Sequence, residues 1–211
     1  NIYPGSNGNY YVAGVDSGEV YVIKFNNSHD TLWARSFKQF IFSSVNLIET
    51  NDNGCAILAF DNGGLMNLIR IDSIGIVSMS KSYDAPSHQG GSDFIQTSDS
   101  CFILCAPVTH IGNPSYYYNQ LVKVDQNGDT VWTKEIPSNF YSFDILEQGT
   151  DLYFSGRIGG LFKTDKDGLP SWSLAIPAQF SRMGIPKKFI GVRSDTLFLI
   201  GNFGLNGNSD S

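Results

Sequence analysis

Basic side chains are scarce in this sequence: Lys and Arg number 14 against 20 Asp and Glu, which gives a formal charge of −6. Nucleic acids and anionic membrane surfaces are bound by clustered Lys and Arg. The basic residues are scattered instead, and the nearest approach to a patch is Arg182 with Lys187 and Lys188. No nucleic acid partner is therefore expected.

Long apolar runs, helix formers and cysteines are also scarce. No apolar run reaches the roughly 18 residues of a membrane span, and no segment has the periodicity of an amphipathic helix. The three cysteines do not have the spacing of a zinc site. Cys101 and Cys105 would lie about 13 Å apart along one strand, too far for a disulfide. We expect no membrane span, and three free structural cysteines including Cys55.

What the sequence does contain is turns, aromatic residues and a repeat. It has 22 glycines and 13% aromatic residues, a composition typical of strands joined by turns. Four segments align without gaps: VIKFNNSHDTLWARSF (22–37), LIRIDSIGIVSMSKSY (68–83), LVKVDQNGDTVWTKEI (121–136) and LFKTDKDGLPSWSLAI (161–176). Each reads as a β-hairpin, in which two alternating strands flank a polar turn.

The aligned columns predict what each hairpin needs. The first turn position holds Asn26, Asp72, Asp125 and Asp165, and the fourth holds His29, Gly75, Gly128 and Gly168. We expect the Asp side chain to cap the turn and the glycine to adopt positive φ. A large apolar column follows, with Trp33, Met79, Trp132 and Trp172. One such side chain per repeat would fill the wedge between adjacent sheets.

A second hairpin precedes each copy, so the period holds four strands over 40 to 53 residues. Its second strand carries a column of small residues, Gly14, Ala59, Cys105, Gly156 and Gly201, which suggests close approach of a neighbouring backbone. Four-stranded repeats of this length predict an all-β fold, a β-propeller of four-stranded antiparallel blades. The blades are expected at about 1–37, 41–83, 92–136 and 140–176, with a partial blade at 187–211, all within one propeller domain.

About four and a half blades are therefore present, and both ends supply inner strands. We interpret the chain as part of a larger propeller; the alternative is a compact five-bladed ring with an imperfect last blade.

The strings KVDQNGDTVWTK and KTDKDGLPSWSL resemble the repeat of bacterial quinoprotein-like propellers, in which a D-x-x-G-x-x-x-W block docks tryptophans between blades. They resemble still more the secreted surface propellers of Bacteroidota, with repeats of the form hKhDxxGxxxWxK, where h is apolar. The resemblance implies export to the cell surface or medium, frequently by type IX secretion. Enzymatic quinoproteins have a cofactor cavity, calcium ligands and an adjacent-cysteine disulfide. Cys101 and Cys105 are not adjacent and no cavity motif is recognisable, so no cofactor is expected.

The candidate binding surface is the rim where connections vary in length, including APVTHIGNPSYYYNQ, DAPSHQGGSD and PAQFSRMGIPKKF. Variable loops on a rigid frame are common binding sites. The candidate residues are His88, Asp93, His110, Tyr116, Tyr117, Tyr118, Tyr141, Phe180 and Arg182. Aromatic residues mixed with a few polar groups suit a glycan or protein partner, although the tyrosines could simply pack the long loop against its blade.

Catalytic and metal sites are less well supported. Asp125, Asn127 and Asp129 match the start of a calcium loop, but Ile136 stands where a bidentate Glu is needed. We interpret this segment as a capped turn, with no metal and no assigned catalytic residue. The expected function is therefore a non-catalytic binding or scaffold propeller. The alternatives are a quinoprotein-like or glycan-active enzyme, for which Asp93 and Asp144 are the aligned carboxylates, and a subunit of a bacterial envelope or secretion assembly.

Overall fold

The computed structural model describes residues 1–38, 42–61, 64–84, 93–110, 113–137, 142–156, 160–175, 184–193 and 196–203. Within these ranges the chain forms β-strands joined by turns, apart from a short 3-10 turn at Ser6–Gly8. The described residues contain no helix that is both long and apolar enough to cross a membrane.

Four sheets each contain four consecutive antiparallel strands. Blade 1 consists of β1 (Ile2–Pro4), β2 (Tyr10–Asp16), β3 (Glu19–Phe25) and β4 (Thr31–Phe37). Blade 2 consists of β5 (Phe42–Glu49), β6 (Cys55–Asp61), β7 (Leu65–Ile71) and β8 (Val77–Asp84). Blade 3 consists of β9 (Asp93–Gln96), β10 (Phe102–His110), β11 (Asn113–Val124) and β12 (Thr130–Pro137). Blade 4 consists of β13 (Ser142–Gln148), β14 (Asp151–Gly156), β15 (Gly160–Asp165) and β16 (Pro170–Ala175). A two-stranded sheet follows, with β17 (Gly184–Arg193) and β18 (Thr196–Phe203).

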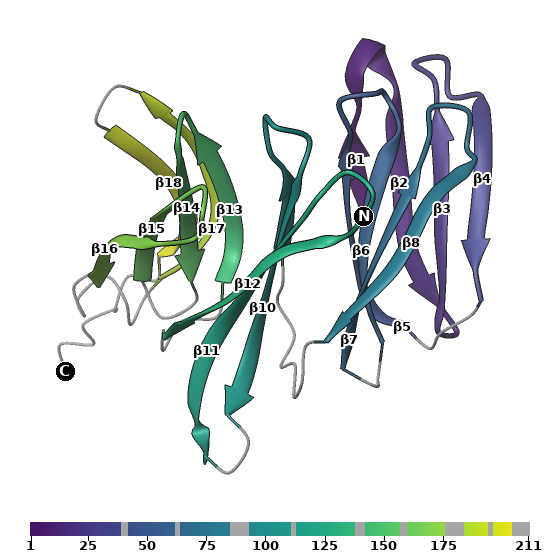
Figure 1. The fold of residues 1–211 in the computed structure, drawn as a ribbon. Coiled ribbons are helices and arrows are strands. Elements are labelled where there is room, and N and C mark those ends of the chain that lie inside the picture. The colour runs from purple at the N-terminus through teal and green to yellow at the C-terminus, as the bar shows by residue number, and fades with distance from the viewer. Residues whose placement is uncertain are drawn as a thin grey trace, which may run out of the picture.

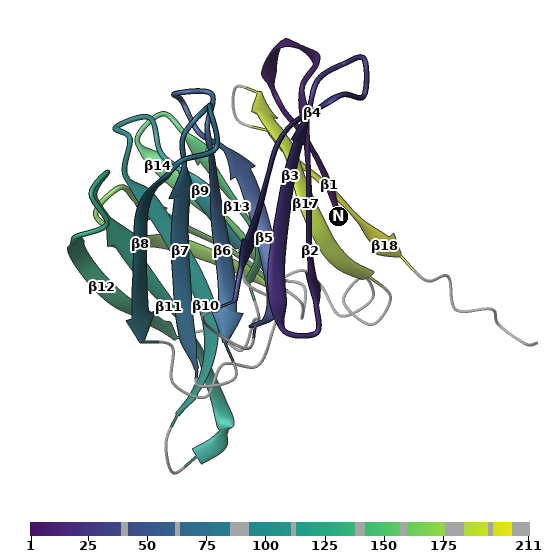
Figure 2. The same ribbon diagram turned by 90° about the vertical axis from the view of Figure 1, so that its right-hand side faces the viewer.

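The sheets stand around a common axis with their first strands innermost. β5 contacts β1, β2 and β9, and β13 contacts both β9 and β17. Figures 1 and 2 show the blades following one another around this axis, with β1–β4 at one end of the series and β17–β18 at the other. The predicted architecture of four-stranded antiparallel blades is confirmed.

The hydrophobic core lies between the blades rather than inside any one of them. β6 is buried at Cys55 through Phe60 because its side chains alternate between two neighbours. Ile57 packs in the cluster with Tyr11 and Trp33 of blade 1. Leu58 packs in the cluster with Phe102 of blade 3. A third cluster joins blade 3 to blade 4. A continuously apolar strand therefore marks a blade that is covered on both faces.

The repeated turn is capped as predicted. Asp125 Oδ1 accepts hydrogen bonds from the backbone N–H groups of Asn127 at 2.9 Å and Asp129 at 2.8 Å. The same two bonds recur at the other three copies, with Asn26, Asp72 and Asp165 as acceptors. One carboxylate or amide oxygen thus holds the whole turn, which is why Asn26 can replace aspartate in blade 1.

Each turn glycine lies against the large side chain of the preceding blade. Gly75, Gly128 and Gly168 have φ of 88°, 82° and 71°. An added Cβ would lie 2.8 Å from the Trp33 ring at Gly75, 2.3 Å from the Met79 sulfur at Gly128 and 2.8 Å from the Trp132 ring at Gly168. Glycine is therefore needed both for its backbone conformation and because a larger residue would collide with the large side chain of the preceding blade. The predicted wedge role of this column is confirmed at these three contacts.

A polar side chain near the end of each inner strand fastens that blade to the previous one. Glu49 accepts a hydrogen bond from the Ser6 N–H at 2.6 Å. Gln96 accepts one from Asn51 N–H at 2.8 Å, and Glu147 accepts one from Ser98 N–H at 2.7 Å. These bonds join blades 1 to 2, 2 to 3 and 3 to 4 at the turns between first and second strands.

The interpretation of the small-residue column is wrong in two respects. An added Cβ at Gly14 would meet nothing within 4 Å. The register also puts Ala106 in the column, because Ala106 pairs with Gln120 as Ala59 pairs with Asn67. Ala59 and Ala106 pack toward the preceding blade. In blade 1 the described clusters contain Tyr11 and Ala13, which lie on the face opposite Gly14. Cys105 comes one residue before Ala106, so its side chain lies on the opposite face and packs toward blade 4.

Candidate functional site

The structure places the predicted recognition residues on different strands. His88, Tyr141, Phe180 and Arg182 lie outside the described residues. His110 ends β10, Tyr116, Tyr117 and Tyr118 lie in β11, and Asp93 begins β9. Asp93 is thus on the innermost strand of blade 3, while the tyrosines are on its third strand. The described part of the chain therefore assigns Asp93 and the tyrosines to different strands of blade 3.

The segment predicted as a long loop at 106–120 is a strand hairpin, which corrects the placement of His110 and the three tyrosines. β10 and β11 remain paired through Val108 with Tyr118 and Thr109 with Tyr117 before the register shifts at His110. β-branched and aromatic residues favour such pairing. Figures 1 and 2 show this hairpin projecting beyond the ends of the neighbouring strands. Likewise, residues 184–189 of the next predicted loop belong to β17.

Tyr118 is the member of the tyrosine group whose side chain the structure describes. It is half-buried and its backbone pairs with Val108 and Pro137. Burial and the neighbouring Glu135 carboxylate raise the pKa of the Tyr118 hydroxyl. The hydroxyl therefore stays protonated at neutral pH and retains its hydrogen-bond donor at the base of the projecting hairpin.

A second group of polar residues occupies one position on successive inner strands. Asn46, Asp93 and Asp144 pair across their sheets with Leu58, Cys105 and Ser155. Asn1 stands at the same position in blade 1, because it exchanges two backbone hydrogen bonds with Ala13. The column therefore changes from amide to carboxylic acid between blades 2 and 3.

Asp93 and Asp144 come close enough to share a proton. Burial, the Asp144 charge and a hydrogen bond to the Asp144 side chain raise the pKa of Asp93 to about 8. Asp93 Oδ2 also accepts a hydrogen bond from the Ile145 N–H at 3.2 Å, across the boundary between blades 3 and 4. Two carboxyl groups this close cannot both be ionised at little cost, so the pair holds one proton at neutral pH.

Tyr3 is a neighbour of this pair on the inner strand of blade 1. Its hydroxyl donates to the Val45 carbonyl oxygen at 3.4 Å and accepts from Asn1 Nδ2 at 3.3 Å. Burial raises the pKa of Tyr3 most, and the Asp93 charge adds to the increase. The Tyr3 hydroxyl is thus bonded to blade 2 through Val45 and lies within electrostatic range of Asp93 in blade 3.

The carboxyl pair joins two neighbouring blades. The Asp93 side chain on β9 is hydrogen-bonded to the Asp144 side chain on β13, and Asp93 also accepts from the Ile145 N–H. The pair therefore helps to hold the inner strands of blades 3 and 4 together.

The residues considered as metal ligands and reactive thiols have other roles. In the described ranges, no group of three or more His, Cys, Asp or Glu side chains could hold a metal ion. Asp125 caps its turn, and Asp129 forms an ion pair with Lys81 of blade 2. All three cysteines are free, as predicted. Burial raises the pKa of the Cys55 thiol to about 12, so this thiol is not an activated nucleophile.

Sequence reasoning missed the role of the basic column that precedes each turn aspartate. Arg70 pairs with Asp52 at 2.9 Å, Lys123 with Asp99 at 2.9 Å and Lys163 with Asp151 at 2.7 Å. Lys24 has no equivalent acid and donates instead to the Asn53 carbonyl oxygen of blade 2 at 2.9 Å. An acid near the start of the second strand in blades 2, 3 and 4 (Asp52, Asp99 and Asp151) was the signal that could have revealed these pairs.

Comparison with solved structures gives many matches at low sequence identity. A protein of unknown function from Bacteroides caccae superposes with a TM-score of 0.62 at 8% identity, over 94% of this chain and 68% of that one. The Dos1 propeller superposes with a TM-score of 0.61 at 11% identity, over 85% of this chain and 48% of that one. The fold is a β-propeller.

A candidate exo-beta-1,3-galactanase from Bifidobacterium bifidum is also similar, with a TM-score of 0.58 at 8% identity over 95% of this chain and 80% of that one. No protein-family model matches the sequence, and no curated protein matches it. Likeness at these identities establishes the architecture alone, because one fold hosts many functions.

Proposed function

We propose that this propeller is a non-catalytic binding or scaffold module that recognises a protein or glycan through the rim carrying the β10–β11 hairpin. The observation that supports the proposal is the projection of this hairpin beyond the neighbouring strands (Figures 1 and 2). A paired hairpin presents its residues with little loss of conformational freedom on binding. The rest of the blade provides a rigid base.

Rigidity of that base comes from contacts on both sides of blade 3. The Asn51–Gln96 and Ser98–Glu147 hydrogen bonds fasten its inner strands to the neighbouring blades. Met79 and Gly128 lock blade 2 against the outer turn of blade 3. A recognition hairpin on such a frame would keep one orientation.

Export to the cell surface or medium is part of the proposal, and it rests on the resemblance of the repeats to Bacteroidota surface propellers. Type IX secretion is the route which that resemblance implies. Fractionation of the native host, with protease treatment of intact cells, tests it. Protection of the protein until the cells are lysed would contradict surface exposure.

The binding role is tested by removing the projecting part of the hairpin. Residues 108–118 are replaced by Asn-Gly, which joins Pro107 to Asn119, a cross-strand pair in the present register. Labelled protein is applied to a glycan array and to an array of extracellular proteins. We expect specific signals to fall about tenfold or more, while the unfolding temperature stays close to that of the parent.

His29→Gly is the matched control, because it alters a turn on the opposite rim, where His29 has φ of 69°. This variant should bind as the parent does. Retention of every specific signal after removal of the hairpin would overturn the proposal.

Two other functions each have one supporting observation. The convergence of Asp93 and Asp144 favours an enzyme at the axis, because it brings together two carboxyl groups, one of them with a raised pKa. Thermal stabilisation or a spectral change with pyrroloquinoline quinone and calcium would support the quinoprotein-like form. The outer strand of blade 4 and the turn before it expose Leu169, Trp172 and Leu174, which favours a subunit of an envelope assembly. A monomer by light scattering at high concentration would count against that role.

A further inference from the structure

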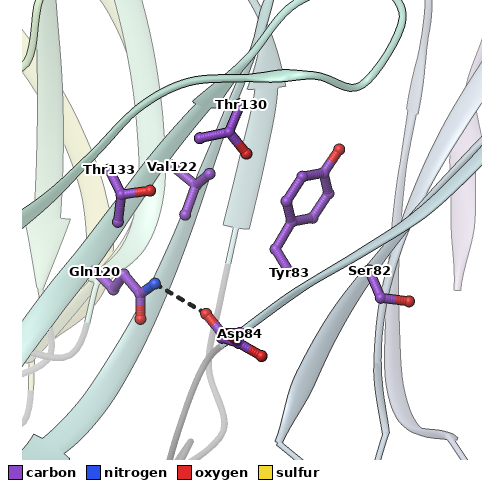
Figure 3. Close-up of a pocket in the computed structure, with 7 residues that line it drawn as sticks. All are labelled: Ser82, Tyr83, Asp84, Gln120, Val122, Thr130 and Thr133. Carbon is purple, nitrogen blue, oxygen red and sulfur yellow. Dashed lines mark hydrogen bonds between the residues drawn. The ribbon is translucent and has the colours of Figure 1, made fainter.

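A pocket of about 410 Å³ opens between blades 2 and 3, away from the axis. Its lining comes from β8 on one side (Ser82, Tyr83, Asp84) and from β11 and β12 on the other (Gln120, Val122, Thr130, Thr133). Figure 3 shows Tyr83 facing Val122 and the two threonines across the pocket, with the Gln120–Asp84 contact below them. The volume falls within the range of small-molecule sites, about 300–1,000 Å³.

Two of the lining residues are fixed by hydrogen bonds across the blade boundary. The Tyr83 hydroxyl donates to the Gly128 carbonyl oxygen at 2.7 Å. Gln120 Nε2 donates to the Asp84 backbone oxygen at 2.8 Å, as Figure 3 shows. Burial, with the nearby Asp129 and Asp125 charges, raises the pKa of Tyr83 to about 12, so the phenol remains a donor. The aromatic wall and the floor of the pocket are therefore preorganised.

Other polar groups in the pocket remain unengaged within the described part of the chain. The hydroxyls of Thr130 and Thr133 and the carboxylate of Asp84 form no hydrogen bond or ion pair there. All three residues are exposed. Ser82 is different, because its hydroxyl donates to Asn67 Oδ1 at 2.7 Å and points away from the other residues in Figure 3. Two hydroxyls and one carboxylate are thus available to a ligand beside the Tyr83 ring.

The repeat provides an internal comparison, because each blade boundary has residues at the same positions. Between blades 1 and 2 these positions hold Phe37, Lys38, Asn67, Ile69, Val77 and Ser80. Between blades 3 and 4 they hold Ile136, Pro137, Gly160, Phe162, Pro170 and Ser173. Blade packing is therefore compatible with apolar residues at these places. The combination of Tyr83, Asp84, Gln120, Thr130 and Thr133 is not demanded by the architecture.

We propose that this pocket between blades 2 and 3 binds a neutral saccharide. A sugar ring has an apolar face, which fits the Tyr83 ring and Val122, and a periphery of hydroxyls that both donate and accept hydrogen bonds. The threonine hydroxyls, the free Gln120 Oε1 and the Asp84 carboxylate match that periphery. The lining carries one negative charge and no positive one, which disfavours acidic sugars. The site is separate from the rim hairpin and does not depend on its function.

Saturation-transfer-difference NMR and isothermal titration calorimetry of the intact chain test the proposal. The neutral probes are methyl β-galactoside, methyl β-glucoside, methyl α-mannoside and diacetylchitobiose; galacturonate and glucosamine are the charged counterparts. We expect at least one neutral probe to bind with a Kd of about 1 mM or tighter. Binding should weaken about tenfold in the Thr130→Val/Thr133→Val double variant, because valine keeps the shape and removes the hydroxyls.

Thr31→Val is the matched control, because Thr31 begins β4 as Thr130 begins β12. It should leave binding unchanged. Three results would each overturn the proposal: no neutral probe binding tighter than about 10 mM, equal binding by the double variant, or preference for either charged sugar.

Discussion

One position on the inner strands carries different chemistry in successive blades. This position is Asn46 in blade 2, Asp93 in blade 3 and Asp144 in blade 4. An amide beside a carboxyl group needs no proton to avoid repulsion, whereas two carboxyl groups do. The change of a single residue type therefore makes the boundary between blades 3 and 4 sensitive to pH.

Substitution of Asp93 by Asn should remove much of this sensitivity. The pKa of Asp93 in the folded protein is raised to about 8. The stabilisation that comes from its protonated form is therefore fully present below its ordinary pKa near 4. That stabilisation is lost as pH rises through about 8. We expect Asp93→Asn to have an unfolding free energy higher than the parent by about 1–3 kcal/mol at pH 9. Urea titrations at pH 5 and pH 9 measure the difference.

Asp99→Asn is the control, because its effect on stability should depend on pH in the opposite direction. Burial opposes ionisation of Asp99, but the hydrogen bonds from Thr97 and Lys123 outweigh it and hold the pKa of Asp99 below its ordinary value. Its stabilisation is present above its ordinary pKa and lost as pH falls below it, so this variant should lose stability at pH 7 and lose less at pH 3. Parallel pH profiles for the parent and the Asp93 variant would contradict the proton-sharing pair.

At the scale of elements, the hairpin repeat could be predicted in detail because its determinants are local. The turn aspartate and the turn glycine are three positions apart, and their bonds stay within five residues. The β10–β11 hairpin could not be predicted in the same way. Its strand pairing between Val108 and Tyr118 depends on contacts across the hairpin, while Gly112 and Pro114 beside it read as a loop.

The turn glycines give a prediction that separates backbone strain from packing between blades. Gly128→Ala would force a Cβ to within 2.3 Å of the Met79 sulfur at φ of 82°. Gly149→Ala has a similar φ of 61° but no atom within 4 Å of the new Cβ. We expect a loss of about 1 kcal/mol at Gly149 and about 2–4 kcal/mol at Gly128. Chemical denaturation measures both.

Met79→Ala combined with Gly128→Ala completes a double-mutant cycle. Removal of the Met79 side chain makes room for the new methyl group, so the second substitution should then resemble the change at Gly149. Equal losses at Gly128 and Gly149 in the parent would show that the outer turn does not press against the preceding blade.

At the scale of the whole molecule, the contacts that decide the architecture join residues far apart in the chain. Asp93 meets Asp144, and Ser6 meets Glu49. The sequence indicates that equivalent blades exist, but the side chains that meet at a boundary depend on how two sheets twist against each other. That is why the wedge column and the alignment of Asp93 with Asp144 could be predicted, whereas the contact between these two carboxyl groups and the pocket lined by Tyr83 and Thr133 emerged only with the structure.

The same reasoning predicts that equivalent tryptophans differ in their contribution to stability. Trp33 is 7% exposed, and its Nε1 donates to the Ser73 carbonyl oxygen of blade 2 at 3.2 Å. Trp172 is 40% exposed and rests edge-on against Tyr153 of its own blade, with ring centroids 6.3 Å apart. Trp33→Ala should lower the unfolding free energy by about 3–5 kcal/mol, and Trp172→Ala by about 1 kcal/mol.

Urea denaturation followed by circular dichroism measures both losses without relying on the fluorescence of the deleted ring. A repeat residue acquires its energetic role from the neighbouring blade, since the residue type and its position in the repeat are the same in the two cases. Comparable losses for Trp33 and Trp172 would mean that each tryptophan stabilises its own sheet, and that the wedge between blades contributes little to holding the propeller together.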